Sequence, residues 1–369
     1  MPDVPELREP DLPRTAKVRT GPLRSGWTTG TCSAAAAKAA ATALATQQVQ
    51  TRVEIGLPDD RRVAFPVERC EVAPSRAKAV VVKDAGDDPD VTHGAHLTAT
   101  VTWAAQYELD GGVGVGVVTK PGLGLDVGGP AINPVPRRMI RQAVAEAVGD
   151  RGVRVVISVP DGEQRAKRTT NARLGILGGI SILGTTGVVR PFSTASWRAS
   201  VVQAVQVMAA QGLPTLVLAT GGRTEGAAMR LLPDLPEVCF VEVGDFTGAA
   251  LTAAREQGLT DVVFVGMVGK LTKLASGVLM THYTRSKVDL SVLAELSPPG
   301  LREEVAAANT ARHAYELWER AGVLRECGDA LCGRVAEVLQ RFGGLPARVA
   351  MVDPEGVRCV AATEPSWVA

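Results

Sequence analysis

The chain has 369 residues, of which 46% are apolar and 21% are charged, so it is not a disordered protein. Its 40 Lys and Arg residues balance 39 Asp and Glu residues, and Phe, Trp and Tyr number only 6, 5 and 3, which argues against binding of nucleic acid or of an anionic membrane. Because it contains no apolar signal segment and no apolar run of about 18 residues, we expect a soluble, cytoplasmic protein.

The first half of the chain opens with a polar, Pro-rich stretch, residues 1–20, which we predict to be a flexible arm. The Ala-rich run at 28–46 predicts a helix that is capped by Thr29 or Thr31. Alanine side chains bury little bulk, so the neighbours of this helix must come close to its backbone.

Short apolar stretches bounded by Gly, Asp or Pro predict several strands in this half. They lie at 52–57, 62–67, 77–83, 96–103, 113–119 and 153–159. A second helix opens at Asn133 and ends at Gly152. Because strands outnumber helices, we predict an N-terminal α+β domain over residues 21–190 with a partly antiparallel sheet.

The second half repeats a strand, a Gly-rich turn and a helix three times. Its apolar strands lie at 215–220, 238–243 and 262–265, with turns through Gly244 and Lys270, and helices dominate from 287 to 342. This rhythm predicts a doubly wound domain with a mainly parallel sheet over 191–345, followed by a C-terminal hairpin and tail at 346–369. The chain is therefore predicted to be a two-domain α/β protein.

Two motifs rich in Thr and Gly are candidate anion sites. The motif at 26–31 leads into the first helix, whose N-terminal N–H groups could receive a carboxylate or a phosphate, although an ordinary capped helix is the alternative. The second motif lies in the segment 177–193, which is either a hinge linker or a loop that lines a cleft. The candidate residues in the two motifs are Thr28, Thr29, Gly30, Thr31, Thr185 and Thr186.

An acidic turn follows the strand predicted at 77–83. It contains Asp84, Asp87, Asp88 and Asp90 beside His93 and His96, and this cluster could bind a cation or sugar hydroxyls, or accept a proton. The spacing is not that of an EF-hand, and a solvated acidic turn is the alternative.

Alternating glycines at 112–116 leave one face of a predicted strand bare, which would let a ligand approach closely. Lys120, Asn133 and Arg137 follow, and they would place polar and cationic groups at a strand end and at a helix start. Exposure of these side chains on a solvated face is the alternative.

The strand-end turns of the second half are candidates for a nucleoside pocket, because parallel sheets bind ligands at the carboxyl ends of their strands. None of the turns is a P-loop. Glu225 or Asp245 could hold ribose hydroxyls. The candidate residues are Gly221, Glu225, Gly244, Asp245 and Gly266.

The sequence contains no pattern typical of a nucleophilic active site or of a metal site. The six cysteines are scattered without zinc spacing, and no Ser-His-Asp order or nucleophile elbow occurs. We therefore predict no protein-bound metal. The residues alone indicate a two-domain α/β enzyme that binds an anionic small molecule.

Five runs of the chain strongly resemble the cobalt-precorrin-5B (C1)-methyltransferase family of anaerobic cobalamin biosynthesis. They are LRSGWTTGTCSAAAAKAA, VVKDAGDDPDVTHGA, GVVTKPGL, PAINPVPRRMI and GGISILGTTGVVRP. The likeness extends from about Leu23 to about Asp289. The chain departs from the family pattern at His93, where Asn is more usual, and at Gly129, where an acidic residue is expected.

The resemblance implies transfer of a methyl group from S-adenosylmethionine to C1 of cobalt-precorrin-5B, which gives cobalt-precorrin-6A. The cobalt arrives with the tetrapyrrole, so no protein metal site is required. The Thr/Gly motifs, Lys120, Asn133 and Arg137 would contact the tetrapyrrole, the acidic turn would act near its ring, and the strand-end turns would hold the methyl donor. A homo-oligomer and transient handover to neighbouring pathway enzymes are compatible with this role. A nucleotide-dependent small-molecule enzyme and a tetrapyrrole-binding protein are the alternatives.

Overall fold

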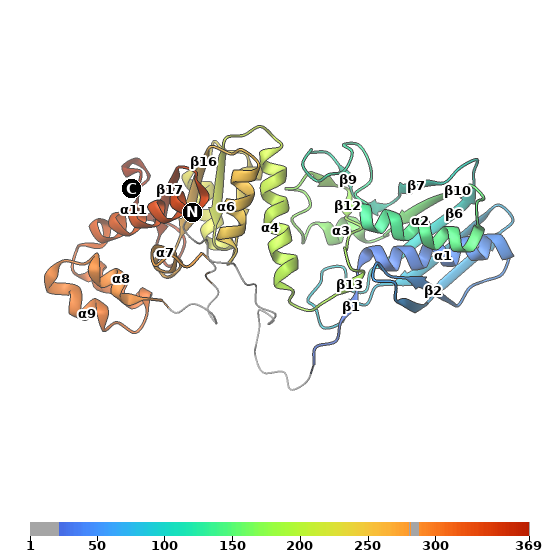
Figure 1. Ribbon diagram of the computed structural model, residues 1–369, viewed down its shortest axis with the longest axis horizontal. Helices are drawn as coiled ribbons and strands as arrows, with labels where there is room; N and C mark the ends of the chain where they lie inside the picture. The colour runs from blue at the N-terminus through green and yellow to red at the C-terminus, as the bar shows by residue number, and fades with distance from the viewer. Residues whose placement is uncertain (1–21, 280, 282–287, 369) are drawn as a thin grey trace. The chain divides into compact units, whose positions relative to one another are not determined.

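The computed structural model describes residues 22–279, 281 and 288–368, so the predicted arm at 1–20 lies outside the described residues. The described chain divides into two compact units with the boundary after Thr194 (Figure 1). We call residues 22–194 the first unit and the described residues from 195 onward the second unit. The domain boundaries expected from the sequence stay a prediction.

The first unit is built on a five-stranded sheet in the order β4-β5-β6-β10-β7, which is antiparallel except for the parallel pair β10–β7. A separate hairpin pairs β2 with β3. The strands of these two sheets are β2 (Arg52–Gly56), β3 (Arg62–Pro66), β4 (Arg69–Ala73), β5 (Arg76–Val82), β6 (His96–Trp103), β7 (Glu108–Gly111) and β10 (Val153–Ser158). The sequence predicted five of them; β4 and β7 were missed because they are short and contain no fully buried residue.

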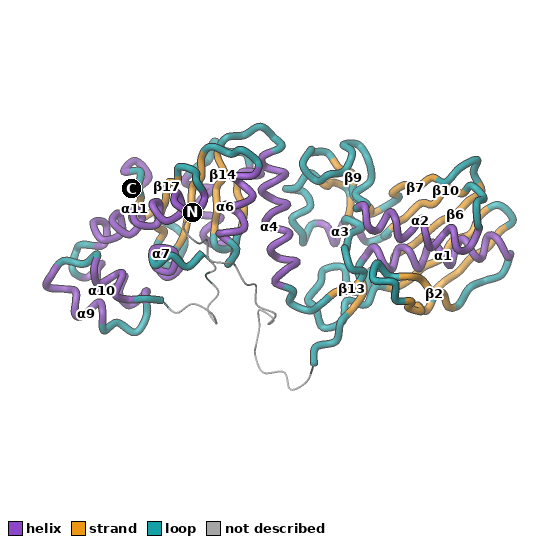
Figure 2. Tube along the Cα trace, viewed as in Figure 1, coloured by secondary structure: helices purple, strands orange, loops and turns teal. Residues whose placement is uncertain are grey.

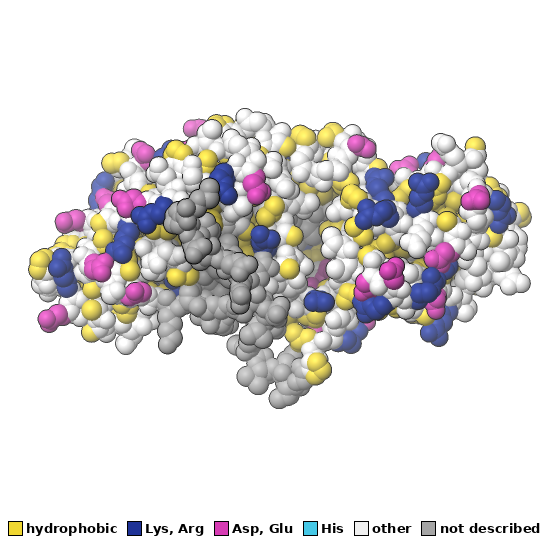
Figure 3. Space-filling model, viewed as in Figure 1, with side chains coloured by type: hydrophobic (Ala, Val, Ile, Leu, Met, Phe, Trp, Pro, Cys, Tyr) yellow, Lys and Arg dark blue, Asp and Glu magenta, His cyan; other side chains and the backbone are white. Residues whose placement is uncertain are grey.

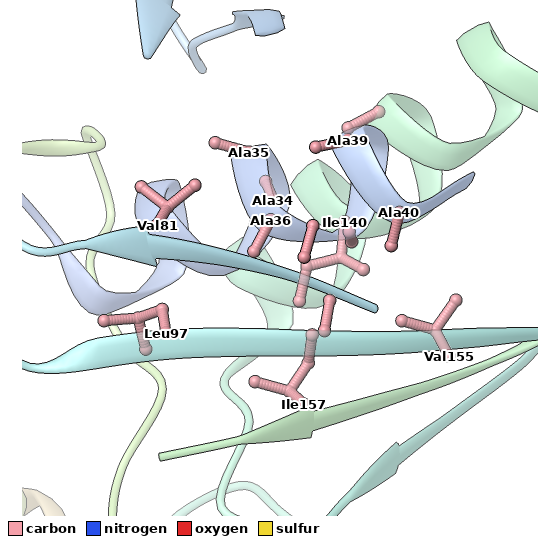
Figure 4. Close-up of a cluster of buried hydrophobic side chains, with 14 of the residues drawn as sticks. Ala34, Ala35, Ala36, Ala39, Ala40, Val81, Leu97, Ile140, Val155 and Ile157 are labelled. Carbon is pink, nitrogen blue, oxygen red and sulfur yellow. The ribbon is translucent and has the colours of Figure 1, made fainter. Parts of the chain in front are cut away.

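Two helices, α1 (Thr29–Thr46) and α2 (Pro134–Val148), lie side by side on one face of this sheet (Figure 4). Ala36 and Ala40 of α1 are fully buried against the strands, and Ile140 of α2 joins the same cluster. Small side chains let the helix backbones approach closely: a Cβ added at Gly30 would lie 2.6 Å from Cγ of Pro136. The close approach expected for the Ala-rich helix is thus observed.

Two local predictions for these helices are wrong by a few residues. The cap of α1 is Thr28, whose Oγ1 accepts a hydrogen bond from the backbone N–H of Thr31 at 3.2 Å, and not Thr29 or Thr31. Helix α2 ends at Val148 with Gly149 as its C-cap, three residues before the predicted end at Gly152.

The prediction of one continuous strand at 113–119 is also wrong. It is broken into β8 (Gly114–Val115) and β9 (Val117–Val118), which belong to different two-stranded sheets with β12 (Gly179–Ile180) and β11 (Ile176–Leu177). The bare glycine face is covered by protein and not open to a ligand, since a Cβ at Gly114 would lie 1.8 Å from the carbonyl oxygen of Val159.

The second unit contains a five-stranded sheet in the order β15-β14-β16-β17-β18. The strands are β14 (Thr215–Ala219), β15 (Phe240–Glu242), β16 (Asp261–Gly266), β17 (Ala347–Val352) and β18 (Cys359–Ala362). The first four are parallel, and β18 is antiparallel to β17. Because β14 is flanked by β15 and β16, the chain leaves β14 and β16 in opposite directions along the sheet, which makes a topological switch point between them.

Helices connect these strands (Figure 2). They are α4 (Thr194–Ala209), α5 (Gly222–Leu231), α6 (Thr247–Glu256), α7 (Val268–Ala275), α8 (Leu290–Glu295), α9 (Arg302–Ala306), α10 (Ala311–Arg320) and α11 (Leu324–Gly343). Lys270 lies within α7 and not in a turn before it. Two sheets with helices between their strands confirm the mixed α/β class.

Acidic and basic side chains are interspersed on the face of each unit seen in Figure 3. This distribution agrees with the near-zero net charge of +1. No helix among the described residues is long and apolar enough to cross a membrane.

The packing of α1 predicts that enlarging one of its alanines destabilises the protein. Ala36→Leu adds three carbons where no space exists, so we expect a loss of about 1–3 kcal/mol in the free energy of unfolding. Ala145→Leu on the exposed side of α2 is the matched control and should change it by less than about 0.5 kcal/mol. Denaturant unfolding measures both, and equal effects would contradict the close packing.

Candidate binding site

The two Thr/Gly motifs meet in the first unit. Short strand β1 (Gly26–Trp27) pairs with β13 (Val188–Val189), and the backbone N–H of Thr28 donates to the carbonyl oxygen of Gly187 at 3.1 Å. The hydroxyl of Thr31 donates to the same carbonyl at 2.7 Å. We call this contact between residues 26–31 and 181–189 the Thr/Gly junction.

Thr29 holds the other side of the Thr/Gly junction. Its Oγ1 lies 3.2 Å from the carbonyl oxygen of Ser181 and accepts a hydrogen bond from the backbone N–H of Leu183 at 2.9 Å. Position 184 of the facing loop must be glycine. Gly184 has φ +126°, and a Cβ added to it would lie 2.5 Å from Cβ of Thr28. The threonines predicted as ligand groups therefore hold two remote segments together.

The first turn of α1 also has its donors occupied. The N–H of Gly30 donates to the carbonyl oxygen of Leu183 at 3.1 Å, and the N–H of Cys32 to that of Thr28 at 3.1 Å. Thr185 and Thr186, by contrast, lie exposed at the tip of the loop. The helix end is thus used internally. The hydroxyl of Thr186 donates to the carbonyl oxygen of Val188 at 3.2 Å, so the hydroxyl of Thr185 is the more open of the two to a ligand.

A pocket of about 260 Å³ lies beside the Thr/Gly junction, wholly within the first unit. It is lined by Thr28, Thr29, Lys83, Asp90, Val91, Thr92, Thr169, Asn171, Ile180, Ser181, Leu183 and Val189. These residues come from both Thr/Gly motifs and from the segment after β5, so the junction itself forms part of the pocket wall.

A buried ion pair lies in the pocket wall. Lys83 is 1% exposed, and its Nζ donates to Oδ2 of Asp90 at 2.6 Å. Asp90 also accepts from the N–H and the hydroxyl of Thr92, each at 2.6 Å. Burial raises the pKa of Asp90, but the Lys83 charge and these hydrogen bonds outweigh it, so the pKa is lowered and the carboxyl stays ionised.

Sequence reasoning included Asp90 in the acidic turn, but it did not select Lys83 and did not predict that the two residues pair. The signal was present: Lys83 follows directly on an apolar strand, where a charged side chain must be either solvated or paired. The acidic turn just after it supplies the partner.

The predicted acidic residues Asp84 and Asp87 hold the chain that precedes β1. Asp84 makes a two-point contact with the guanidinium of Arg24, and Asp87 accepts from the backbone N–H of Arg24 at 2.8 Å. The hydrogen bond from Arg24 lowers the pKa of Asp84, so this carboxylate is ionised at neutral pH and cannot act there as a proton donor. Asp88 accepts from the N–H of Phe192 at 2.8 Å.

His93 lies beside this turn with a half-exposed ring. Its Nδ1 accepts a hydrogen bond from the N–H of Ala85 at 3.1 Å, so in the neutral ring the proton is on Nε2. His93 can therefore offer an outward N–H donor.

The remaining candidate side chains of the first unit are those of Lys120, Asn133 and Arg137, and they differ in their hydrogen bonds to the backbone. The Nζ of Lys120 donates to the carbonyl oxygen of Arg173 at 3.0 Å, and Nε of Arg137 donates to that of Ile132 at 2.7 Å. Asn133 is the N-cap residue of α2, but its side chain makes no capping hydrogen bond. Among these three, the Asn133 amide is the least constrained by neighbouring backbone.

In the second unit, Gly221 and Gly266 lie at the carboxyl ends of β14 and β16, on the two sides of the switch point. A Cβ added at Gly221 would meet nothing within 4 Å, whereas one at Gly266 would lie 3.1 Å from Cδ2 of Leu271. Space for a ligand is therefore open at Gly221. Glu225 lies in the first turn of α5, which begins at this same strand end.

Asp245 is engaged by protein groups. Its carboxylate forms an ion pair with Lys270, and it accepts from the hydroxyl of Thr281 at 3.2 Å. Lys270 also donates to the carbonyl oxygen of Gly244 at 3.1 Å. A ribose at Asp245 would have to compete with these contacts.

The described residues contain no group of three or more His, Cys, Asp and Glu that could hold a metal ion. Burial raises the pKa of the Cys32 thiol to about 12 and those of Cys327 and Cys359 to about 11. These thiols are not thiolates at neutral pH and do not serve as nucleophiles.

Comparison with known proteins gives matches along most of the chain. Residues 16–191 match the family described as CbiD, and residues 280–363 match the CbiD C-terminal domain. A cobalt-precorrin-5B C(1)-methyltransferase from Salinispora tropica is 68% identical over 98% of each chain. The one from Rubrobacter xylanophilus is 62% identical and covers 98% of this chain and 97% of its own.

One solved structure also matches: a crystal structure of cobalamin biosynthesis protein (cbiD) from Archaeoglobus fulgidus. It is 30% identical and covers 71% of this chain and 83% of its own, with a TM-score of 0.39.

The Thr/Gly junction predicts a difference between two glycine variants. Gly184→Ala and Gly178→Ala both place a side chain at positive φ, but only the former meets an atom within 4 Å. We expect Gly184→Ala to lower the free energy of unfolding by at least about 2 kcal/mol more than Gly178→Ala. Chemical denaturation tests this, and equal losses would mean that the junction is loosely packed.

Proposed function

The chain belongs to the CbiD family, and from this premise we infer that it is a cobalt-precorrin-5B C(1)-methyltransferase, which forms cobalt-precorrin-6A in anaerobic cobalamin synthesis. The observation that carries the inference is 68% identity over 98% of both chains with a relative of that name. A match over so much of both chains leaves little of either protein unpaired, so the activity is assigned to the whole chain and not to one part of it.

S-adenosylmethionine, when bound, supplies a methyl group on a positively charged sulfur. The new C–C bond forms as the S–C bond breaks, in line, and the donor leaves as a neutral thioether. Such a reaction needs alignment of the two reactants and exclusion of water more than it needs a nucleophilic side chain. The unreactive thiols of the first and second units agree with this requirement.

We propose that the first unit binds the tetrapyrrole, whose rim carries acetate and propionate carboxylates. The support is a set of donors on one unit: the exposed hydroxyl of Thr185, the Asn133 amide, which makes no capping hydrogen bond, and the Nε2–H of His93. The Thr186 hydroxyl would join them on releasing the carbonyl oxygen of Val188. Lys120, two residues after β9, and Arg137, in the first turn of α2, add positive charge to the same unit. Carboxylates are bound well by such donors.

We propose that the acidic turn positions the ring and balances charge there, and does not donate a proton. Asp84 is kept ionised by Arg24, and Asp87 and Asp88 each accept a backbone N–H. Ionised Asp84 beside the ring would favour a cationic transition state, since positive charge passes from sulfur to the substrate as the methyl group moves.

We propose that the second unit binds the methyl donor at its switch point. The support is the open space at Gly221, beside the start of α5 and near the end of β16. Ligands of open parallel sheets bind outside the carboxyl ends of strands at such a point. Glu225 is placed to accept the ribose hydroxyls, and Gly244, Asp245 and Gly266 shape the neighbouring turns.

The two units would then act as separate domains with separate ligands, one for the tetrapyrrole and one for the donor. We also propose a cytoplasmic location, as expected for a biosynthetic enzyme whose cysteines are free thiols. Homo-oligomerisation and handover of the tetrapyrrole stay predictions.

The decisive experiment is incubation of the purified protein with cobalt-precorrin-5B and S-adenosylmethionine carrying a labelled methyl group. We expect a product heavier by one methyl, with the label at C1, and release of S-adenosylhomocysteine. Tetrapyrrole binding without a mass gain would indicate a binding protein. Thermal stabilisation by ATP or NAD but not by S-adenosylhomocysteine would favour a nucleotide-dependent enzyme.

The donor site predicts a selective effect of Gly221→Val. The substitution meets no atoms and its extended backbone accepts any residue, so the protein should fold normally while the added side chain fills the space at the switch point. We expect S-adenosylhomocysteine to bind at least about tenfold more weakly in calorimetry. Gly333→Val, which also meets no atoms but lies in α11, is the matched control and should bind normally. Unchanged affinity in Gly221→Val would move the donor elsewhere.

A further inference from the structure

We propose that the pocket beside the Thr/Gly junction is a subsite for one carboxylate side arm of the tetrapyrrole, with Lys83 and Ser181 as the donors that hold it. The inference rests on the proposed function, because that function supplies a substrate with carboxylate arms. Neither residue was selected from the sequence.

Lys83 has hydrogen-bonding capacity left over. An ammonium group has three N–H donors, and among the described residues Lys83 uses one, toward Asp90 at 2.6 Å. The side chain is 1% exposed, so bulk water cannot satisfy the others freely, yet it lines the pocket. A buried cation with unused donors is stabilised by an anion that enters the same space.

Ser181 is a second donor in the same wall. It is 8% exposed, and its hydroxyl has no hydrogen bond to any residue that the structure describes. Its backbone carbonyl faces Oγ1 of Thr29, which fixes the residue at the Thr/Gly junction. The hydroxyl oxygen is not among the described side-chain atoms that are fully buried without a partner, so it is reached from the pocket, where a ligand oxygen can take the place of water.

The balance of donors and acceptors selects an anion over a cation. Asp90, the acidic residue of the pocket wall, already accepts three hydrogen bonds, one from Lys83 and two from Thr92. A metal ion or an amine would have to displace them. The unused groups on Lys83 and Ser181 are donors, so a carboxylate fits and a cation does not.

The pocket is large enough for one side arm of the tetrapyrrole but not for its ring. A volume of about 260 Å³ lies at the lower end of small-molecule sites and is too small for a macrocycle of four pyrrole-derived rings. It suits a chain of two or three carbons that ends in a carboxylate. Val91, Ile180 and Val189 supply apolar wall for the methylene groups.

The first test is equilibrium binding of cobalt-precorrin-5B, followed by its absorbance, to the full-length protein and to Lys83→Met. Methionine keeps most of the volume and loses the charge. We expect affinity to fall about tenfold to a hundredfold, the loss typical of a hydrogen bond to a charged group, while S-adenosylhomocysteine binds as before. Lys78→Met, on strand β5 just before Lys83 in the chain, is the matched control and should leave both affinities unchanged.

Two further variants guard against misfolding, because Lys83→Met leaves the buried Asp90 without its cation. The double variant Lys83→Met/Asp90→Asn removes both charges, and the Asn oxygen can still accept from Thr92. Ser181→Ala removes one hydroxyl and no charge. We expect the double variant to lose tetrapyrrole affinity like the single one, and Ser181→Ala to lose it about threefold to tenfold.

The second test identifies the ligand group. Substrate esterified at one side arm at a time is bound to the wild-type protein and to the double variant. We expect one ester position to weaken wild-type binding and to have no effect on the double variant, because the partner of that arm is gone. Acetate and propionate serve as probes of a free small carboxylate: competition by either, without any sensitive ester position, would assign the pocket to a separate anion.

The outcomes separate the two proposals. If the wild-type protein neither binds nor methylates the tetrapyrrole, the proposed function fails. If it binds and methylates, but the folded Lys83 and Ser181 variants bind with wild-type affinity and no ester position is sensitive to them, the pocket assignment alone is overturned.

Discussion

The contact between the first turn of α1 and the loop 181–189 is the constraint on which the first unit depends. Residues separated by more than 150 positions in the chain are joined there by the hydroxyls of Thr29 and Thr31 and by the N–H of Gly30. Each of these groups would otherwise be buried without a partner at the start of an Ala-rich helix, at a cost of about 1–3 kcal/mol each. Satisfying them fixes the loop, and the fixed loop forms one wall of the pocket.

A helix end committed in this way cannot also bind a ligand with the same N–H groups. The groups left to bind a ligand are side chains that the Thr/Gly junction holds in place but does not use. They are the Lys83 ammonium and the Ser181 hydroxyl inside the pocket and the exposed loop threonines outside it. The first unit can therefore be rich in polar groups and still offer few of them to a substrate. The proposed selectivity for one carboxylate arm rests on that scarcity.

Periodicity and turn chemistry predicted most of the secondary structure, since β6 has the predicted bounds and α1 begins one residue late. They could not predict which remote segments pair. The glycines at 112–116 look like a bare strand face until the carbonyl of Val159 is found against Gly114. Likewise, a threonine motif before a helix is the same sequence whether its hydroxyls face a ligand or another loop. Asp90 and Lys83 were obscured for a related reason: an ion pair is visible only when both partners are placed.

In the second unit, three Gly-rich turns follow strands and look equivalent in the sequence. The order of the strands in the sheet distinguishes them. With β14 between β15 and β16, only the turns after β14 and β16 border the switch point, whereas the turn after β15 is closed by the Lys270–Asp245 pair and by the Lys270 contact to the carbonyl of Gly244. An acidic residue that is already neutralised by a lysine gains little from a ribose hydroxyl, because that exchange loses a charged contact for a neutral one. The strand order and the Lys270–Asp245 pair are therefore the grounds for proposing the donor site at the turn after β14, where the backbone at Gly221 is open.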